Sequence, residues 1–127
     1  MINEKFLQLL NVLLEGTRAG KIKWHETVDE DAFRVVFGAG LVRIESRLDP
    51  VDETTFFVVS LLNRQGRTIE TVTASLNMVT YPEPQVSYSF LSDLYTAARA
   101  SARAADDVLD SILRDAEAGK TIDPSKE

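Results

Sequence analysis

The chain contains no cysteine, and it has no apolar run long enough to cross a membrane. The absence of cysteine excludes disulfide bonds, thiolate zinc sites and cysteine nucleophiles, and it is typical of proteins in a reducing cytoplasm. A membrane-spanning helix needs about 18 apolar residues in succession, and no segment of the 127 residues approaches that length. The opening residues MINEKFLQLL lack the basic region and cleavage site of a signal peptide. We therefore expect a cytoplasmic protein that does not bind membranes.

Histidine and positive charge are also scarce. His25 is the only histidine, so any Ser-His-Asp triad would have to use it, and no Gly-x-Ser-x-Gly elbow accompanies it. We interpret His25 as a surface residue. The chain has 14 basic and 20 acidic residues and a net charge of −6. This balance argues against a general nucleic-acid binder.

Two other patterns could suggest ligand chemistry, and both have simpler structural readings. The carboxylates of Asp106, Asp107 and Asp110 lack the spacing of a calcium-binding loop. The glycines of Gly38-Ala39-Gly40 fit a hairpin turn rather than a phosphate-binding loop. We therefore predict no catalytic residue, no metal site and no cofactor, and we do not expect an enzyme.

Length and hydrophobic spacing indicate one domain with a helix at each end. We assign residues 1–118 to a single α+β domain and residues 119–127 to a flexible polar tail. Apolar residues recur at helical spacing from Ile2 to Leu13, with Asn3 as a suitable N-cap, which predicts a helix ending near residues 17–19. A stripe of Leu, Ile and Ala at helical spacing runs from Leu91 to Ala116, which predicts a helix from Leu91 to Ala118.

The C-terminal helix is too long for the sheet that we expect beneath it. Unbroken, it would measure about 42 Å, whereas a strand of about eight residues spans about 27 Å. The helix therefore overhangs the sheet or breaks. We place a break within residues 104–107 and expect Asp106 to be the internal N-cap.

Alternating apolar residues and short turns predict a five-stranded antiparallel meander between the helices. The fourth strand, TTFFVVSLLN, is apolar on both sides, so we expect both of its faces to be covered. The fold class is α+β: N-terminal helix, meander, then a long or broken C-terminal helix, with both helices on one sheet face. The expected strands are Lys21–Thr27, Ala32–Phe37, Leu41–Leu48, Thr54–Asn63 and Arg67–Leu76.

Two short segments resemble those of other proteins. Leu13–Trp24, LLEGTRAGKIKW, and Leu91–Tyr95, LSDLY, resemble a loose group of small bacterial proteins of unknown function. That group has a helix, Thr-x-x-Gly, a strand with Ile-x-Trp, a meander and a C-terminal helix. The resemblance implies this order of elements and carries no activity or functional residues. In size, acidity and α+β build the chain is also similar to secretion-type chaperones, whose sheet is usually interrupted by a helix; we expect none between residues 32 and 76.

One face of the expected sheet gathers basic and apolar side chains. This mixture is typical of the core and rim of a protein interface. The alternative is a solvated face on which Lys and Arg stems cover apolar atoms. The strand register is not fixed by the sequence, so Phe57 and Val59 could lie on this face instead of Phe56 and Val58. The interface candidates are Lys21, Lys23, His25, Arg34, Arg43, Arg47, Phe56 and Val58.

We expect a non-enzymatic protein-interaction module that forms a homodimer through the outer sheet face or the overhanging C-terminal helix. Two alternatives stay open. A secretion-type chaperone would hold a segment of a client protein. A small-molecule sensor or enzyme would place a pocket between the sheet and the Ala-rich helix. The pocket candidates are Tyr81, Tyr88, Tyr95, Arg99 and Arg103.

Overall fold

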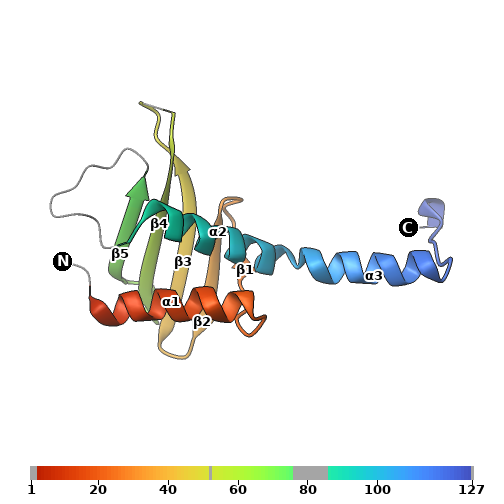
Figure 1. Cartoon of the computed structure of the whole chain (residues 1–127), viewed down its shortest axis with the longest axis horizontal. Coiled ribbons are helices and arrows are strands. Elements are labelled where there is room, and N and C mark those ends of the chain that lie inside the picture. Colours follow the sequence, from red (N-terminus) through yellow and green to blue (C-terminus); the bar gives the residue numbers. More distant parts are fainter. Residues whose placement is uncertain (1–2, 52, 76–85, 127) are drawn as a thin grey trace.

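The structure, a computed structural model, describes residues 3–51, 53–75 and 86–126. It is an α+β fold with an N-terminal helix, a five-stranded sheet and two C-terminal helices (Figure 1). The elements are α1 (Glu4–Arg18), β1 (His25–Glu26), β2 (Ala32–Phe37), β3 (Gly40–Leu48), β4 (Thr55–Asn63), β5 (Thr68–Ser75), α2 (Tyr88–Arg103) and α3 (Ala105–Glu117), followed by a 3-10 turn at Pro124–Lys126.

The sheet is the predicted antiparallel meander, with the strands side by side in chain order. β2 has the predicted bounds, and the described ends of β3, β4 and β5 lie within one residue of the prediction. Among the described residues, no helix interrupts the sheet between β2 and β5. Residue 52 lies outside the described residues. The described boundaries of β2 to β5 therefore follow from side-chain alternation and turn residues.

The first strand was predicted too long. The sequence predicts Lys21–Thr27, but β1 contains only His25–Glu26. The backbone N–H groups of Lys21 and Ile22 donate to the Gly16 carbonyl at 2.9 and 3.1 Å, so this segment bonds to the end of α1 rather than to β2. Lys21 and Lys23 are consequently not on the sheet face to which they were assigned.

The core lies between the sheet and two helices on one side of it. α1 and α2 pack side by side over that face, as predicted (Figure 1). None of the described helices covers the opposite face, so the expected cover on both faces of β4 is not found in this part of the chain. Burying a side chain of Leu or Phe size stabilises the fold by about 1.5–3 kcal/mol. The buried side chains include Phe6, Leu10, Leu13, Trp24, Phe33, Val42, Ile44, Phe57, Val59, Leu91, Leu94 and Ala98.

The C-terminal helix breaks where the sequence predicts, but its expected cap is wrong. α2 starts after the N-cap Ser87 and ends at Arg103. Ala104 has a φ of 47°, in the left-handed region, and α3 begins at the next residue. Asp106 lies inside α3, so it is not the N-cap, and the Ala104 position has no side-chain cap. Beyond the break, α3 extends past the β1 edge of the sheet and away from the body (Figure 1).

None of the described helices has both the length and the apolar content of a membrane span.

Candidate interaction surface

The sheet face opposite α1 and α2 is called the outer face. Its members follow from the register, because residues directly opposite one another in an antiparallel pair share a face. Phe56 pairs with Arg47, and Val58 pairs with Glu45, so Phe56 and Val58 belong to it. Phe57 and Val59 point into the core. The outer face consists of His25, Ala32, Arg34, Val36, Leu41, Arg43, Glu45, Arg47, Phe56, Val58, Ser60, Leu62, Thr68, Thr71, Thr73 and Ser75.

Six of the eight interface candidates therefore share this face. His25 stands opposite Arg34, and Arg34 stands opposite Arg43. These three residues form a basic row across β1, β2 and β3. Arg47 lies two residues beyond Glu45 on β3, opposite Phe56. Lys21 and Lys23 precede β1 and lie outside the face.

The apolar members of the outer face form a second row at the β2–β3 turn. Val36 is opposite Leu41, and Leu41 is opposite Leu62. Val36 is 58% exposed, while Leu41 and Leu62 are half-buried. Val58 lies on β4 farther from this end of the sheet. It is only 8% exposed, between Glu45 and Thr73 of the adjacent strands. The face thus combines an accessible apolar row with a basic row beside it.

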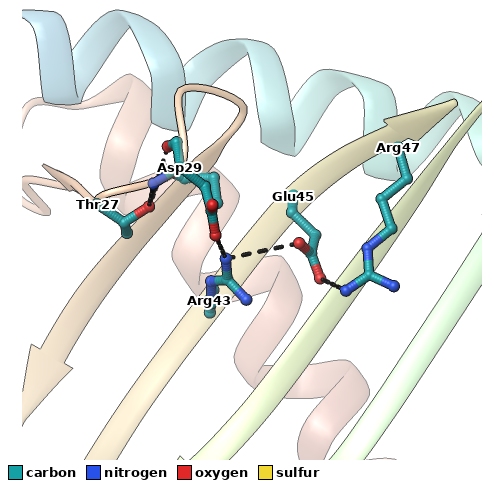
Figure 2. Close-up of polar contacts among 6 residues, drawn as sticks. Thr27, Asp29, Arg43, Glu45 and Arg47 are labelled. Atoms are coloured by element: carbon teal, nitrogen blue, oxygen red, sulfur yellow. Dashed lines mark hydrogen bonds and ion pairs between the residues drawn. The ribbon is translucent and has the colours of Figure 1, made fainter.

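Ion pairs hold part of the basic row in place. The Arg43 guanidinium lies 2.5 Å from the Asp29 carboxylate and 3.6 Å from Glu45, and Arg47 lies 2.7 Å from Glu45 (Figure 2). Like charges directly opposite on a sheet destabilise it, so Asp29 and Glu45 offset the repulsion between Arg43 and Arg34. Exposed pairs of this kind each contribute little to folding. Their effect is to fix the positions of Arg43 and Arg47.

The turn before β2 is itself ordered by hydrogen bonds. The Thr27 hydroxyl accepts from the Asp29 backbone N–H at 3.1 Å and donates to the Ala32 carbonyl at 3.0 Å. This arrangement directs Asp29 toward Arg43 (Figure 2). The Arg34 side chain, by contrast, is exposed and makes no ion pair or hydrogen bond with any other described residue. Of the arginines on this face, Arg34 is therefore the one that lacks an acidic neighbour in the described part of the chain.

A second uncovered surface is α3. Its side chains Val108, Leu109, Ile112 and Leu113 are 53–57% exposed. Steps of one and four residues place all of them on one side of the helix. The apolar stripe read from the sequence contains Leu109 and Ile112, but it does not say whether they face a neighbouring element. In the structure α3 continues from the end of α2 away from the body (Figure 1), and this apolar side is exposed.

An apolar depression of about 360 Å³ lies at the end of the sheet that carries the β2–β3 and β4–β5 turns. Phe37, at its edge, is 45% exposed although it alternates with the buried Phe33 and Val35. Sequence reasoning missed this depression. A meander does place both turns at one end, but the hollow depends on how far the helices extend over the sheet. Its apolar lining comes chiefly from Leu9, Phe37, Leu41, Leu61, Leu62 and Ile69.

The tyrosines proposed for a ligand pocket lie within the packing between α2 and the sheet. The Tyr95 ring is buried, with its centroid 5.6 Å from that of Phe33 and 5.2 Å from that of Phe57. The centroid of the Tyr88 ring lies 5.2 Å from that of the Phe57 ring. Burial raises the pKa of Tyr95, and the nearby Asp31 carboxylate adds to the increase. Tyr81 lies outside the described residues.

The two pocket arginines occupy different surroundings. The Arg103 guanidinium lies 5.7 Å from the centre of the Phe33 ring and 3.6 Å from the Glu26 carboxylate. Arg99 is exposed on α2. Arg103 therefore covers the edge of the aromatic cluster instead of pointing into a cavity beside the tyrosines.

A separate depression of about 350 Å³ lies where the end of α1 approaches the junction of α2 and α3. Its lining includes Arg18, Lys23, Ser101 and Asp107. Lys23 is thus near this depression rather than on the sheet. Among the described residues, no three His, Asp or Glu side chains are grouped to hold a metal ion.

No family model matches this chain, and neither the curated proteins nor the solved structures contain a match.

Proposed function

We propose that the protein is a non-enzymatic protein-interaction module that self-associates as a homodimer. The proposal rests on the exposure of α3, an amphipathic helix whose four large apolar side chains are more than half exposed. Burying a fully exposed side chain of this size contributes about 1.5–3 kcal/mol, so burying the exposed half of each contributes about half as much. A contiguous apolar surface of this kind marks a site for a partner.

A second copy of the chain is the simplest partner. The outer face also lacks a covering helix among the described elements and bears the accessible row of Val36, Leu41 and Leu62. A two-fold dimer is the commonest closed arrangement of identical chains. We further propose the cytoplasm as its compartment, which agrees with a cysteine-free sequence.

Light scattering on the purified chain at micromolar concentration tests self-association directly. We expect a species of twice the 14.1 kDa mass of the chain. Dilution should shift the population toward monomer if the interface is reversible. A single monomeric species throughout the micromolar range would contradict the proposal.

A pair of full-length variants connects the dimer to the exposed helix. Ile112→Gln removes an apolar side chain from α3, whereas Ile122→Gln removes one from the segment after α3, where Ile122 is 80% exposed. We expect Ile112→Gln to weaken dimerisation and Ile122→Gln to leave it unchanged. Equal effects of the two changes would show that α3 has no special part in association.

A further inference from the structure

The outer face and the apolar side of α3, which no other described helix covers, complement each other in charge and length. We propose that in the dimer α3 of each copy lies across the outer face of the other copy, so that the two chains exchange their C-terminal helices. This inference rests on the proposed self-association and specifies which surfaces meet.

α3 presents an apolar strip with acidic borders. At 100° per residue, its four large apolar side chains occupy an arc of about 140° around the helix axis. Asp115 borders this arc on the side of Val108, and Asp110 and Glu117 border it on the side of Leu113. In all, Ala105–Glu117 contains five acidic residues and one basic residue. The strip therefore fits an apolar surface with basic groups beside it.

The outer face has that composition. Its accessible apolar row at Val36 runs beside the basic row that contains Arg34 and Arg43. Arg43 already has carboxylates at Asp29 and Glu45, but Arg34 has no such partner among the described residues. An acidic border of α3 lying beside Val36 would give Arg34 one.

Charge also distinguishes this arrangement from direct pairing of two α3 helices. In an α3–α3 pair, the acidic borders of both helices would face each other across the contact. Like charges at close range across an interface are unfavourable. When α3 lies on the outer face instead, its acidic borders lie beside basic side chains, and this contact is attractive.

The direction of α3 fits contact with a neighbour. α3 continues past the β1 edge and across the strand direction (Figure 1). Its own outer face lies on the far side of the sheet from the α1 and α2 layer, so α3 does not reach it in this arrangement. A second copy beside the β1 edge, turned by half a rotation about an axis parallel to the strands, presents its outer face toward that helix layer. The same rotation brings its own α3 onto the outer face of the first copy.

The dimensions of the two surfaces agree. α3 has 13 residues and is therefore about 20 Å long. Five strands spaced about 4.8 Å apart span about 19 Å from the first to the last. Stable interfaces bury about 1,200–2,000 Å² in total, more than one short helix supplies. Two-fold symmetry repeats the contact between α3 and the outer face, and the two adjacent β1 edges add to the same interface.

Cysteine cross-linking tests the exchange, because the chain has no cysteine of its own. A tagged copy carrying Val36→Cys is coexpressed with an untagged copy carrying Ile112→Cys, and the pair is treated with a short thiol cross-linker. The control pair replaces Val36→Cys with Val12→Cys. Val12 lies on α1 and, at 52% exposed, is similar to Val36 in accessibility. The tag separates mixed products from products of two identical copies by mass.

We expect the Val36–Ile112 pair to give a mixed cross-linked dimer in large excess over the control pair. Light scattering on the same samples separates the two proposals. A dimer whose cross-links join two Ile112 positions, or two Val36 positions, would overturn the helix exchange and leave self-association standing. A monomer in light scattering would overturn both.

Discussion

Thr17 is a residue on which the junction between α1 and the sheet depends. Its hydroxyl is buried, accepts a hydrogen bond from the Trp24 indole Nε1 at 2.8 Å and donates to the Leu13 carbonyl at 2.6 Å. Trp24 is only 2% exposed, and its backbone N–H donates to the Ser101 hydroxyl of α2 at 2.8 Å. These bonds join α1, the segment before β1 and α2.

We expect Thr17→Val to destabilise the fold by about 1–3 kcal/mol, because the buried indole N–H loses its acceptor. Chemical denaturation of the full chain measures this change. Thr96→Val is the matched control, since Thr96 is exposed on α2 and the same β-branched residue is introduced into a helix. Equal stability of the two variants would mean that the indole finds another acceptor.

Tyr95 gives the stability a dependence on alkaline pH. Burial raises its pKa above the ordinary 10.0, so the folded state holds the phenolic proton more tightly than the unfolded state does. The resulting contribution is fully present below pH 10 and is lost as pH rises through the higher folded-state pKa. We expect the free energy of unfolding to fall less steeply above pH 10 in Tyr95→Phe than in the parent chain. Parallel profiles would show that Tyr95 ionises alike in both states.

At the scale of elements, the motif that connects α1 to β1 has a structural explanation. A Cβ atom at Gly16 would lie 2.5 Å from Ile22 Cδ1, so a larger residue would displace the Ile22 side chain. Gly20 has a φ of 75°, a conformation that favours glycine. Together with Thr17 and Trp24, these residues account for the Leu13–Trp24 segment through packing and turn geometry.

The segment before β1 also shows why some strand boundaries can be predicted from the sequence and others cannot. β2 to β5 bond to strands adjacent in sequence, so alternation and turn residues sufficed to place their described parts within one residue. The backbone N–H of Trp24 bonds instead to Ser101, 77 residues away. No local pattern indicates that partner, and the alternation from Lys21 onward therefore predicted a longer strand than β1.

α2 offers a second test at this scale. Ala98 is fully buried in the core, whereas Ala100, two residues on, is exposed. We expect Ala98→Leu to overpack the core and destabilise the chain by about 1–3 kcal/mol. Ala100→Leu, which has the same change in helix propensity, should stay near the parent. Thermal melting of both variants measures the difference, and a parent-like melting temperature for Ala98→Leu would indicate room beside α2.

At the scale of the whole molecule, the candidate surface was only partly predictable. Alternation correctly grouped His25, Arg34, Arg43 and Arg47, because side chains two residues apart share a face. It could not decide between Phe56 and Phe57, since that choice depends on which face the helices cover. The exposure of α3 was also undetermined, because the direction of that helix is set by the backbone at Ala104.

The helix exchange makes a specific prediction about charge. Arg34→Glu places an acid beside the acidic border of the partner's α3, so we expect the dimer dissociation constant to rise about tenfold, or about 1.4 kcal/mol. Asp110→Lys reverses the facing charge and should also weaken the dimer when made alone. Arg64→Glu, in the β4–β5 turn, is the matched control and should have little effect. All variants are compared by sedimentation at equal ionic strength, because salt screens such pairs.

The double variant decides the matter. If Arg34 of one copy faces Asp110 of the other, Arg34→Glu with Asp110→Lys restores an opposite-charge pair in both contacts of the dimer. Its dissociation constant should then lie closer to the parent value than to either single variant. Contacting residues show such coupling, whereas independent sites add their effects. A double variant weakened by the sum of the two single changes would place α3 away from the Arg34 row.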